Sequence, residues 1–400
     1  MQDNMIKDKI RGCLIAGAAG DALGYEVEFM NRRAIFASFG EQGITKFALD
    51  INGKALISDD TQMTLFTANG LLMGLTRGYM RGIGGCPEKY VDLAYLDWYY
   101  TQTGRQQSDC NYTWLYSLAE MYHLRAPGNT CLNACESLLQ GKKVINNSKG
   151  CGGIMRVAPM ALLNVGYASR NEQCYTIKEL AQAGGEIAEC THKHPLGFLP
   201  ASLLTVLLYK IVPMTAQQVK KEIDHIVAET LDILNVIYED KYAKEKKYLK
   251  ALTEKAMQLA HSKISDAEAI AQLGEGWTGE EAWAIALYSA LRYIDNLEKA
   301  IIISVNHDGD SDSTGSICGN IMGAIYGYEH IKERNIFCSE NKKLEETLEL
   351  SEIILTLADD LATGCIISEY DHIDTPEKQQ WYERYCLMMP KGIRKIKNEE

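Results

Sequence analysis

The sequence predicts an all-α protein, and three observations lead to that prediction. Along many segments apolar residues recur at spacings of three and four, the period of a helix with one buried face. Runs that alternate apolar and polar residues, as half-buried strands do, are hard to find. Only eight prolines occur in 400 residues, so long helices can run without a break. At typical helix lengths we expect about fifteen helices or more.

Residues 215–240 show the helical pattern most clearly, because Thr215 and Gln218 have the spacing of a capping box at its start. The apolar positions that follow are Val219, Ile223, Val227, Leu231 and Leu234. The same start signal occurs twice more, as Ser265 with Glu268 and as Thr278 with Glu281. These pairs predict three helix N-termini.

Length and composition indicate one large globular domain that covers residues 1–400. The chain is 46% hydrophobic and 8% aromatic, an ordinary composition for a folded protein. No segment rich in Pro, Gly and Ser divides it. The charged residues 238–255 are expected to form a surface excursion, and the basic residues 391–397 a solvated tail.

The net charge indicates which binding partners to expect, and the cysteines indicate the cellular compartment. Lys and Arg number 41 and Asp and Glu 53, so the net charge is −12. Phosphate backbones attract basic proteins, so we expect neither general nucleic-acid binding nor membrane binding. No apolar run reaches the ~18 residues of a membrane span, and the N-terminus lacks the order of a secretory signal. The 12 scattered cysteines favour reduced thiols and a cytoplasmic location.

Two acidic stretches are the most unusual features of the sequence. In the first, Ser58 is a good N-cap and is followed by Asp59 and Asp60, which a well-capped helix alone would explain. In the second, three carboxylates crowd before a helix expected over residues 314–327. They are Asp308, Asp310 and Asp312. An exposed acidic loop is one interpretation. An EF-hand is disfavoured, because its sixth and twelfth positions hold Ser and Gly here.

Glycines after the second acidic stretch suggest how the carboxylates meet. Gly315, Gly319, Gly323 and Gly327 recur every fourth residue and form a smooth stripe on one helix face. Residues 14–29 offer a matching stripe at Ala16, Gly20 and Gly24, followed by Glu28. Close packing of the two helices would bring their acidic ends together. Buried carboxylates in such numbers need cations, and oxygen ligands select Mg²⁺, Mn²⁺ or Ca²⁺. Two ions are plausible.

Four motifs in order resemble those of the ADP-ribosylglycohydrolase family, which includes the dinitrogenase-reductase-activating glycohydrolases. They are GDALGYEVEF (20–29), SDDTQMT (58–64), SKGCGGIMRVAP (148–159) with THKHP (191–195), and GDSDST (309–314). The resemblance implies a compact orthogonal multi-helix fold with a central dinuclear site of two Mg²⁺ ions, or of Mn²⁺. Asp308 falls where the family often has a small residue, so it is left out of the ligand set.

The resemblance also implies roles for individual residues. The metal ligands that it implies are Ser58, Asp59, Asp60, Asp310, Asp312 and Ser313. The catalytic candidates are Glu28, Asp60 and Asp310, and which of them moves the proton is left open. The substrate-binding residues that it implies are Ser148, Gly150, Cys151, Gly152, Gly153 and His192.

The glycine loop and the histidines can also be interpreted from the residues alone, without the family resemblance. From the residues alone, Gly150, Gly152 and Gly153 form either a structural turn or a phosphate cradle of backbone N–H groups. The resemblance implies the diphosphate cradle of ADP-ribose, with Cys151 where many members have Asn. We expect Arg156 to form a structural ion pair. A zinc site at Cys190, His192 and His194 is disfavoured, His194 is expected to be structural, and His307 is either a bystander or a support of the acidic loop.

The implied function is metal-dependent hydrolysis at C1″ of the distal ribose, releasing ADP-ribose from a modified protein or small molecule. Arginine-linked substrate is the first choice, and neither the natural target nor the linkage can be read from the motifs. Two alternatives stay open. One is a non-catalytic, crystallin-like or ADP-ribose-binding protein on the same fold. The other is a metal-dependent hydrolase that cuts the diphosphate and yields AMP.

Overall fold

The computed structural model describes residues 2–82, 86–104, 111–169 and 175–386, and the expected basic tail lies outside them. Within these residues the chain forms eighteen α-helices, four short 3₁₀ helices and no strand, which confirms the all-α prediction. Two isolated bridges, Ala55 with Leu348 and Gly150 with Thr278, are the β-type pairings of the described part.

The elements follow one another in this order. The first half contains α1 (Gln2–Tyr25), α2 (Arg32–Phe39), α3 (Asp59–Tyr79), η1 (Pro87–Tyr90), α4 (Val91–Thr103), η2 (Trp114–Ser117), η3 (Ala119–Tyr122), α5 (Asn129–Leu139), η4 (Cys151–Gly153), α6 (Ala158–Ser169), α7 (Ile177–Glu189) and α8 (Pro195–Ile211). The second half contains α9 (Ala216–Val236), α10 (Ala243–Ala260), α11 (Asp266–Ala271), α12 (Gly279–Arg292), α13 (Leu297–Val305), α14 (Ser311–Tyr326), α15 (Tyr328–Arg334), α16 (Leu344–Thr347), α17 (Ser351–Thr363) and α18 (Pro376–Tyr385).

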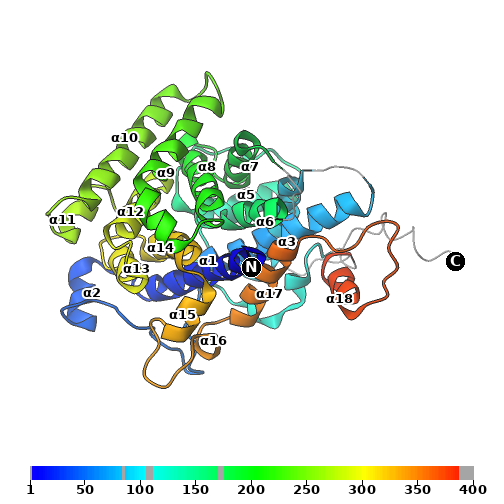
Figure 1. Cartoon of the computed structure of the whole chain (residues 1–400), viewed down its shortest axis with the longest axis horizontal. Coiled ribbons are helices and arrows are strands. Elements are labelled where there is room, and N and C mark those ends of the chain that lie inside the picture. Colours follow the sequence, from blue (N-terminus) through cyan, green and yellow to red (C-terminus); the bar gives the residue numbers. More distant parts are fainter. Residues whose placement is uncertain (1, 83–85, 105–110, 170–174, 387–400) are drawn as a thin grey trace.

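Helices α1 and α14 pack antiparallel at the centre of the molecule (Figure 1). A Cβ atom on Gly20 would lie 2.1 Å from the Gly315 carbonyl oxygen, and one on Gly319 would lie 2.0 Å from that of Ala16. Backbone therefore touches backbone, as the two small-residue stripes predict. Gly12, opposite Gly323, extends the contact by one further turn. The antiparallel pairing sets the C-terminal end of α1 beside the N-terminal end of α14.

The three predicted helix starts are all correct, although only two of them have the complete capping box. Thr215 at α9 and Ser265 at α11 form complete capping boxes. Thr278 precedes α12 but makes no cap hydrogen bond, because the Glu281 carboxylate accepts the backbone N–H of Glu275 instead, at 3.3 Å. Helix α14 begins at Ser311, three residues before the predicted start. The reason is a cap from the acidic stretch itself, described with the site.

The charged segment 238–255 is not a surface excursion but includes most of an amphipathic helix, α10. Its buried face carries Leu249, Leu252 and Ala256, and Thr253 accepts the indole N–H of Trp283 on α12 at 2.9 Å. The charged residues cover the outer face of the same helix. Charge density in the sequence hid the apolar positions, which recur at helical spacing.

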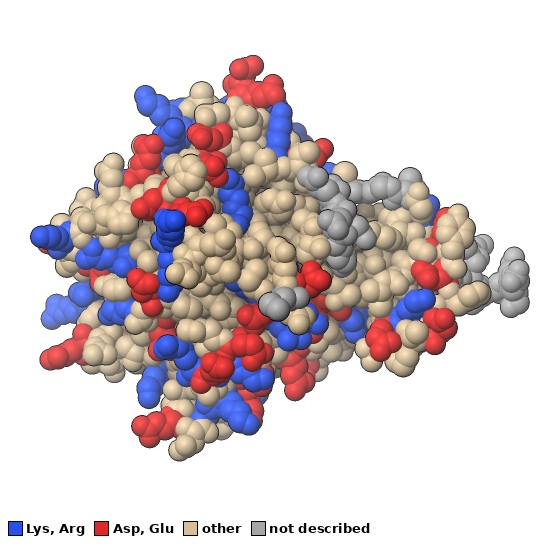
Figure 2. All heavy atoms as spheres, viewed as in Figure 1, with Lys and Arg blue, Asp and Glu red and all other residues tan. Residues whose placement is uncertain are grey.

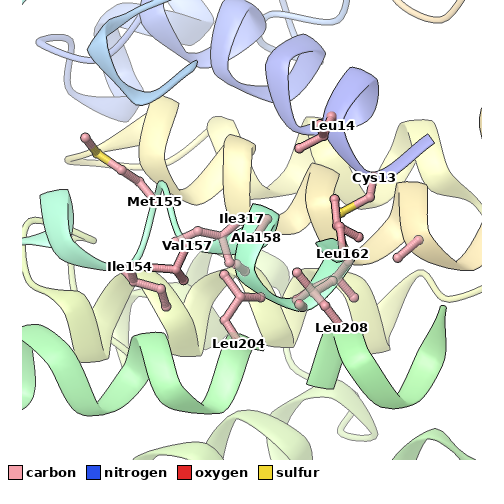
Figure 3. Packing of buried hydrophobic residues seen from close by; sticks show 14 of the residues in the cluster. Cys13, Leu14, Ile154, Met155, Val157, Ala158, Leu162, Leu204, Leu208 and Ile317 are labelled. Atoms are coloured by element: carbon pink, nitrogen blue, oxygen red, sulfur yellow. The ribbon is translucent and has the colours of Figure 1, made fainter. Parts of the chain in front are cut away.

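Apolar side chains from distant parts of the chain fill the space around α1 and α14. In Figure 3, Cys13 from α1 lies near Leu162 of α6, and Ile317 from α14 lies near Leu204 of α8. Leu14 and Leu208 belong to the same buried cluster. Full burial of each such side chain stabilises the fold by about 1.5–3 kcal/mol. Charges of both signs are interspersed on the face shown in Figure 2. None of the helices in the described ranges has the length and apolar character that spanning a membrane requires.

The backbone contact between α1 and α14 can be tested by adding a side chain to it. We expect Gly319→Leu to lower the free energy of unfolding by about 3 kcal/mol or more, because overpacking against rigid backbone cannot relax. Gly319→Ala should already destabilise, since its Cβ meets the Ala16 carbonyl oxygen. The measurement is chemical unfolding monitored by circular dichroism. Gly128→Ala is the matched control, because a Cβ there meets nothing within 4 Å. Unchanged stability of Gly319→Leu would disprove the close approach.

Candidate active site

A cavity of about 220 Å³ lies where the ends of α1, α3 and α14 meet the glycine loop that contains η4. Most residues that the sequence singled out line it. They are Glu28, Asp59, Asp60, Gly150, Cys151, Gly152, His192, Asp310, Asp312 and Ser313. The other three candidates, Ser58, Ser148 and Gly153, are not among the lining residues. Residues more than 250 positions apart in the sequence thus share one cavity.

Helix α3 is fixed at its N-terminus by two side chains. Ser58 caps it by accepting the Asp60 N–H at 3.1 Å, as predicted. Asp21 of α1 accepts the Ser58 N–H at 3.0 Å, the Thr61 N–H at 3.1 Å and the Thr61 hydroxyl proton. Asp21 was not assigned a role from the sequence, although a single carboxylate inside an apolar helix is a signal that it has one. It joins α1 to the acidic end of α3.

Asp59 is held from the opposite side of the cavity. Its carboxylate accepts the Gly128 N–H at 3.2 Å, and its own N–H donates to the Arg125 carbonyl at 2.9 Å. The Arg125 guanidinium pairs with Glu349 at 2.6 Å, and Glu349 also accepts the Ile57 N–H at 3.1 Å. This ion pair braces the segment that leads into α3.

The second acidic stretch forms the N-terminus of α14. Asp310 caps the helix by accepting the Ser313 N–H at 3.1 Å, which explains the early helix start. Its other oxygen accepts the Cys151 thiol proton at 2.6 Å. The Asp312 carboxylate also accepts the Ser313 N–H, at 2.9 Å. Asp308 points elsewhere and accepts the Arg32 N–H at 2.7 Å, which agrees with leaving it out of the ligand set.

His307 and Gly309 shape this acidic loop. The His307 ring lies 2.9 Å from the Thr314 hydroxyl and 2.8 Å from the Asp308 carbonyl oxygen, so it supports the loop. Gly309 has φ +114, and a Cβ there would lie 2.0 Å from the Glu275 carbonyl oxygen. That same oxygen accepts the Asp310 N–H at 2.9 Å. Glycine is therefore required where the loop crosses residue 275.

The carboxylates of the cavity repel one another and have few partners. Burial, followed by the charge of Asp312, raises the pKa of Glu28 to about 10 and that of Asp21 to about 7. Burial, followed by the charge of Asp312, also raises the pKa values of Asp59, Asp60 and Asp310 well above the usual range. These shifts show that the charged forms lack a counter-charge.

The donor set fits a hard divalent cation. One oxygen of Asp60 and one of Glu28 are buried and accept no hydrogen bond. All the acidic donors are oxygens, and Ser58 and Ser313 add hydroxyls, which is the chemistry that Mg²⁺ and Mn²⁺ prefer. A cation at this position would supply the charge that the unpartnered oxygens lack.

The described residues do not show the predicted dinuclear centre. Among them, no three His, Cys, Asp or Glu side chains stand together as a ready metal site. Asp59, Asp310 and Asp312 each turn an oxygen toward a backbone N–H. His194, which was expected to be structural, caps α8 by accepting the Leu196 N–H at 3.1 Å.

The glycine loop packs more closely than a simple phosphate cradle would require. The Gly150 N–H donates to the Ser148 hydroxyl at 3.3 Å, and the Cys151 N–H donates to the Trp277 carbonyl at 3.2 Å. These two N–H groups are therefore bonded within the protein in this structure. A Cβ on Gly152 would lie 3.0 Å from the His192 ring, so the glycine allows that ring to approach.

His192 is buried behind the loop and is neutral. Burial, together with the positive charge of Arg156, lowers its pKa to about 3. Its Nδ1 lies 2.8 Å from the Thr191 hydroxyl. Its other ring nitrogen is the nearest atom to the position that a Cβ on Gly150 would take, at 3.2 Å. Gly150 and Gly152 have no side chains to cover the His192 ring, so the ring lines the cavity.

Arg156 does not form the expected ion pair with any described residue. It is fully buried, and its guanidinium lies 4.5 Å from the centre of the Tyr95 ring. It donates to the Thr191 hydroxyl at 2.5 Å and to the Ile187 carbonyl at 3.2 Å. It also approaches the Cys131 sulfur at 3.3 Å. A π face, a carbonyl and polarisable sulfur replace the carboxylate partner.

Comparisons with known proteins agree with this geometry. A family model described as ADP-ribosylglycohydrolase matches residues 2–368. The ADP-ribosylhydrolase ARH1 of Dictyostelium discoideum is 26% identical over 400 residues, covering 86% of this chain and 93% of that protein. The ADP-ribosyl-[dinitrogen reductase] glycohydrolase of Rhodospirillum rubrum is 24% identical over 336 residues, 82% and 88% of the two chains.

Other relatives match over a shorter span. The ADP-ribosylhydrolase ARH3 of Bos taurus is 23% identical over 221 residues, so the match covers 50% of this chain and 56% of that protein. The chain thus spans little more than half the length of that relative. A solved ADP-ribosylglycohydrolase-related protein complex shares the fold, with a TM-score of 0.59 and 21% identity over 90% of this chain and 100% of that one.

The raised pKa values predict how stability depends on pH and on metal. In the folded protein these carboxyls hold protons that the unfolded chain releases near pH 4, so stability falls as pH rises from about 4 through 7 and beyond. We expect Mg²⁺ or Mn²⁺ to raise the melting temperature by several degrees at pH 8 and little at pH 5. Differential scanning calorimetry with and without EDTA measures this.

Asp60→Asn is the variant to compare with the wild type in the same calorimetric measurement. Removing one buried charge should stabilise the metal-free protein at pH 8 and abolish most of the response to Mg²⁺. Potassium chloride at equal ionic strength is the control for screening. If the melting temperature at pH 8 does not change on addition of Mg²⁺, Mn²⁺ or EDTA, the cavity holds no cation site.

Proposed function

This chain belongs to the ADP-ribosylglycohydrolase family, and from that premise we propose that it is a metal-dependent hydrolase that releases ADP-ribose from an ADP-ribosylated acceptor. The bond cleaved is the one between C1″ of the distal ribose and the acceptor. The observation that supports this most is the set of buried, unpartnered carboxylate oxygens that face a cavity beside the glycine loop. A purely structural protein would have no use for such oxygens.

Metal dependence is general in this family, and we propose two Mg²⁺ ions, or Mn²⁺, for this chain. Ser58, Asp59 and Asp60 would hold them from α3, and Asp310, Asp312 and Ser313 from α14. When bound, a hard divalent cation supplies positive charge that polarises substrate oxygens and neutralises the carboxylates.

The chain's own residues have distinct tasks in this proposal. The loop Ser148–Gly153 and His192 bind the diphosphate, which places the distal ribose over the acidic wall. A water adds at C1″ as the bond from C1″ to the acceptor breaks, and the acceptor leaves with a proton. Nearby carboxylates stabilise the positive charge that develops on the ribose.

Among the three catalytic candidates, hydrogen bonding separates Asp310 from the others. Its two oxygens accept from the Ser313 N–H and the Cys151 thiol, so they are occupied. Glu28 and Asp60 each keep an oxygen without a partner. We therefore assign the movement of the water proton to Glu28 or Asp60, and a positioning role to Asp310.

The acceptor is proposed to be an arginine side chain. An acidic cavity suits a guanidinium leaving group, and the relative from Rhodospirillum rubrum is named for an ADP-ribosylated protein, dinitrogen reductase. The substrate would be an ADP-ribosylated protein or a small molecule. We place the protein in the cytoplasm, where the ten cysteines that are free among the described residues would stay reduced.

Asp310→Asn tests the acidic wall of α14. The variant keeps the side-chain size and should fold, because the cap to Ser313 can be made by the amide oxygen. We expect release of ADP-ribose to fall by about 100-fold or more, as for loss of several kcal/mol of electrostatic stabilisation. Asp308→Asn is the matched control and should retain activity, since Asp308 accepts from Arg32 outside the cavity. Equal activity of the two variants would exclude Asp310 from the site.

The products and the linkage separate the competing functions. With Mg²⁺ present, we expect free ADP-ribose from arginine-linked substrate, measured by chromatography. Release of AMP would instead show cleavage of the diphosphate. Turnover of serine-linked substrate alone would refute the arginine preference and keep the hydrolase. Binding of ADP-ribose with no turnover of any linkage would show a binding protein.

A further inference from the structure

Two stacked aromatic side chains, one of which lines the cavity, are used by no step proposed so far. Phe29 and Trp277 lie with their ring centres 6.2 Å apart and their planes at 24° to one another. The Phe29 side chain is 74% exposed and Trp277 is 39% exposed, although large aromatic side chains are usually buried. Trp277 also lines the cavity together with Glu28.

Each ring is attached to a different wall of the cavity. Phe29 follows Glu28 directly, in the turn that ends α1 beside the acidic wall. Trp277 accepts the Cys151 N–H through its carbonyl, and its neighbour Thr278 is bridged to Gly150. Trp277 therefore moves with the glycine loop. The pair spans from the acidic wall to the glycine loop.

The size of the cavity implies that part of the substrate lies outside it. Pockets that enclose drug-sized ligands have about 300–1,000 Å³, whereas this cavity has about 220 Å³. An ADP-ribosylated acceptor is larger than such a ligand. The part that emerges at the Glu28 side must pass the two rings.

The chemistry around the rings selects a planar cation. A guanidinium stacks on aromatic faces and at the same time pairs with carboxylates. Glu28, immediately before Phe29 in the chain, has a buried oxygen with no hydrogen-bond partner. An adenine base would also stack on the rings, but it carries no charge to pair with this carboxylate. The combination of two rings with one carboxylate favours the cation.

We propose that Phe29 and Trp277 form the acceptor subsite, in which the guanidinium of an ADP-ribosylated arginine lies between the two rings and faces Glu28. This proposal rests on the proposed function and adds the part of the site that reads the acceptor. A planar guest needs ring planes about 7 Å apart, because carbon atoms pack at about 3.5 Å. The rings must therefore part before a planar guest fits between them, and the exposed Phe29 ring has room to do so.

The test compares Trp277→Ala and Phe29→Ala with the wild type, with Mg²⁺ present throughout. For arginine-linked substrate, we expect kcat/KM of Trp277→Ala to fall about tenfold, mainly through a higher KM. Binding of free ADP-ribose, measured by calorimetry, should stay within about twofold of wild type. Trp277→Phe should restore most of the activity. Tyr370→Ala is the matched control, because Tyr370 is 86% exposed and is not among the residues that line the cavity.

Two results would overturn the assignment. If Trp277→Ala weakens binding of free ADP-ribose as much as it weakens turnover, the rings bind the adenine. If Trp277→Ala lowers the activity on serine-linked and on arginine-linked substrate equally, the rings do not recognise the acceptor.

A second measurement separates this proposal from the proposed function. N-acetylarginine amide is titrated into wild type saturated with ADP-ribose, with Trp277 fluorescence as the signal. Quenching in wild type that disappears in Phe29→Ala supports the acceptor subsite, even if wild type hydrolyses no substrate. An absence of quenching in a wild type that does hydrolyse arginine-linked substrate would overturn the subsite and leave the hydrolase intact.

Discussion

The backbone contact between α1 and α14 is the constraint on which the rest of the structure depends. Glycine and alanine along both helices remove the side chains that would hold the axes apart, so carbonyl groups of one helix face Cα atoms of the other. Such proximity leaves no freedom in register. The end of α1 that leads to Glu28 is thereby fixed next to the capped start of α14, and Asp21 ties the same helix to the start of α3.

This arrangement concentrates charge at a cost that the surrounding fold must offset. Several carboxylates are buried, and the nearest fully buried arginine, Arg156, is directed toward Tyr95 rather than toward them. Backbone N–H groups satisfy part of the negative charge, and protons satisfy another part. The large apolar core around α6, α8 and α14 provides the stability against which this local repulsion is set.

Much of the fold could be predicted from the sequence because its signals are local. Capping at Thr215 and Ser265, the glycine spacing of α14 and the matching stripe in α1 all depend on residues within a few positions of one another. The failures involve competing partners that the pattern does not reveal. Glu281 bonds to the nearby Glu275 rather than to Thr278, and Arg156 contacts sulfur and a ring instead of a carboxylate.

The site was predictable to the same extent. The acidic residues and the loop were found, because each carries a compact pattern. The brace between Arg125 and Glu349 was not, since its members are 224 positions apart. The orientation of the carboxylates was not predicted either, because it depends on partners distant in the sequence, such as the Gly128 N–H that donates to Asp59.

The long separation of α1 and α14 also affects how the protein is made. The Asn320 side chain of α14 bonds to the Cys13 carbonyl of α1 across 307 positions. At ribosomal rates of about 5–20 residues per second, α1 emerges roughly 15–60 s before its partner has been synthesised. During that interval its small-residue face has no helix to pack against. The central pair of helices can therefore assemble only after α14 has left the ribosome, and the acidic cavity forms no earlier.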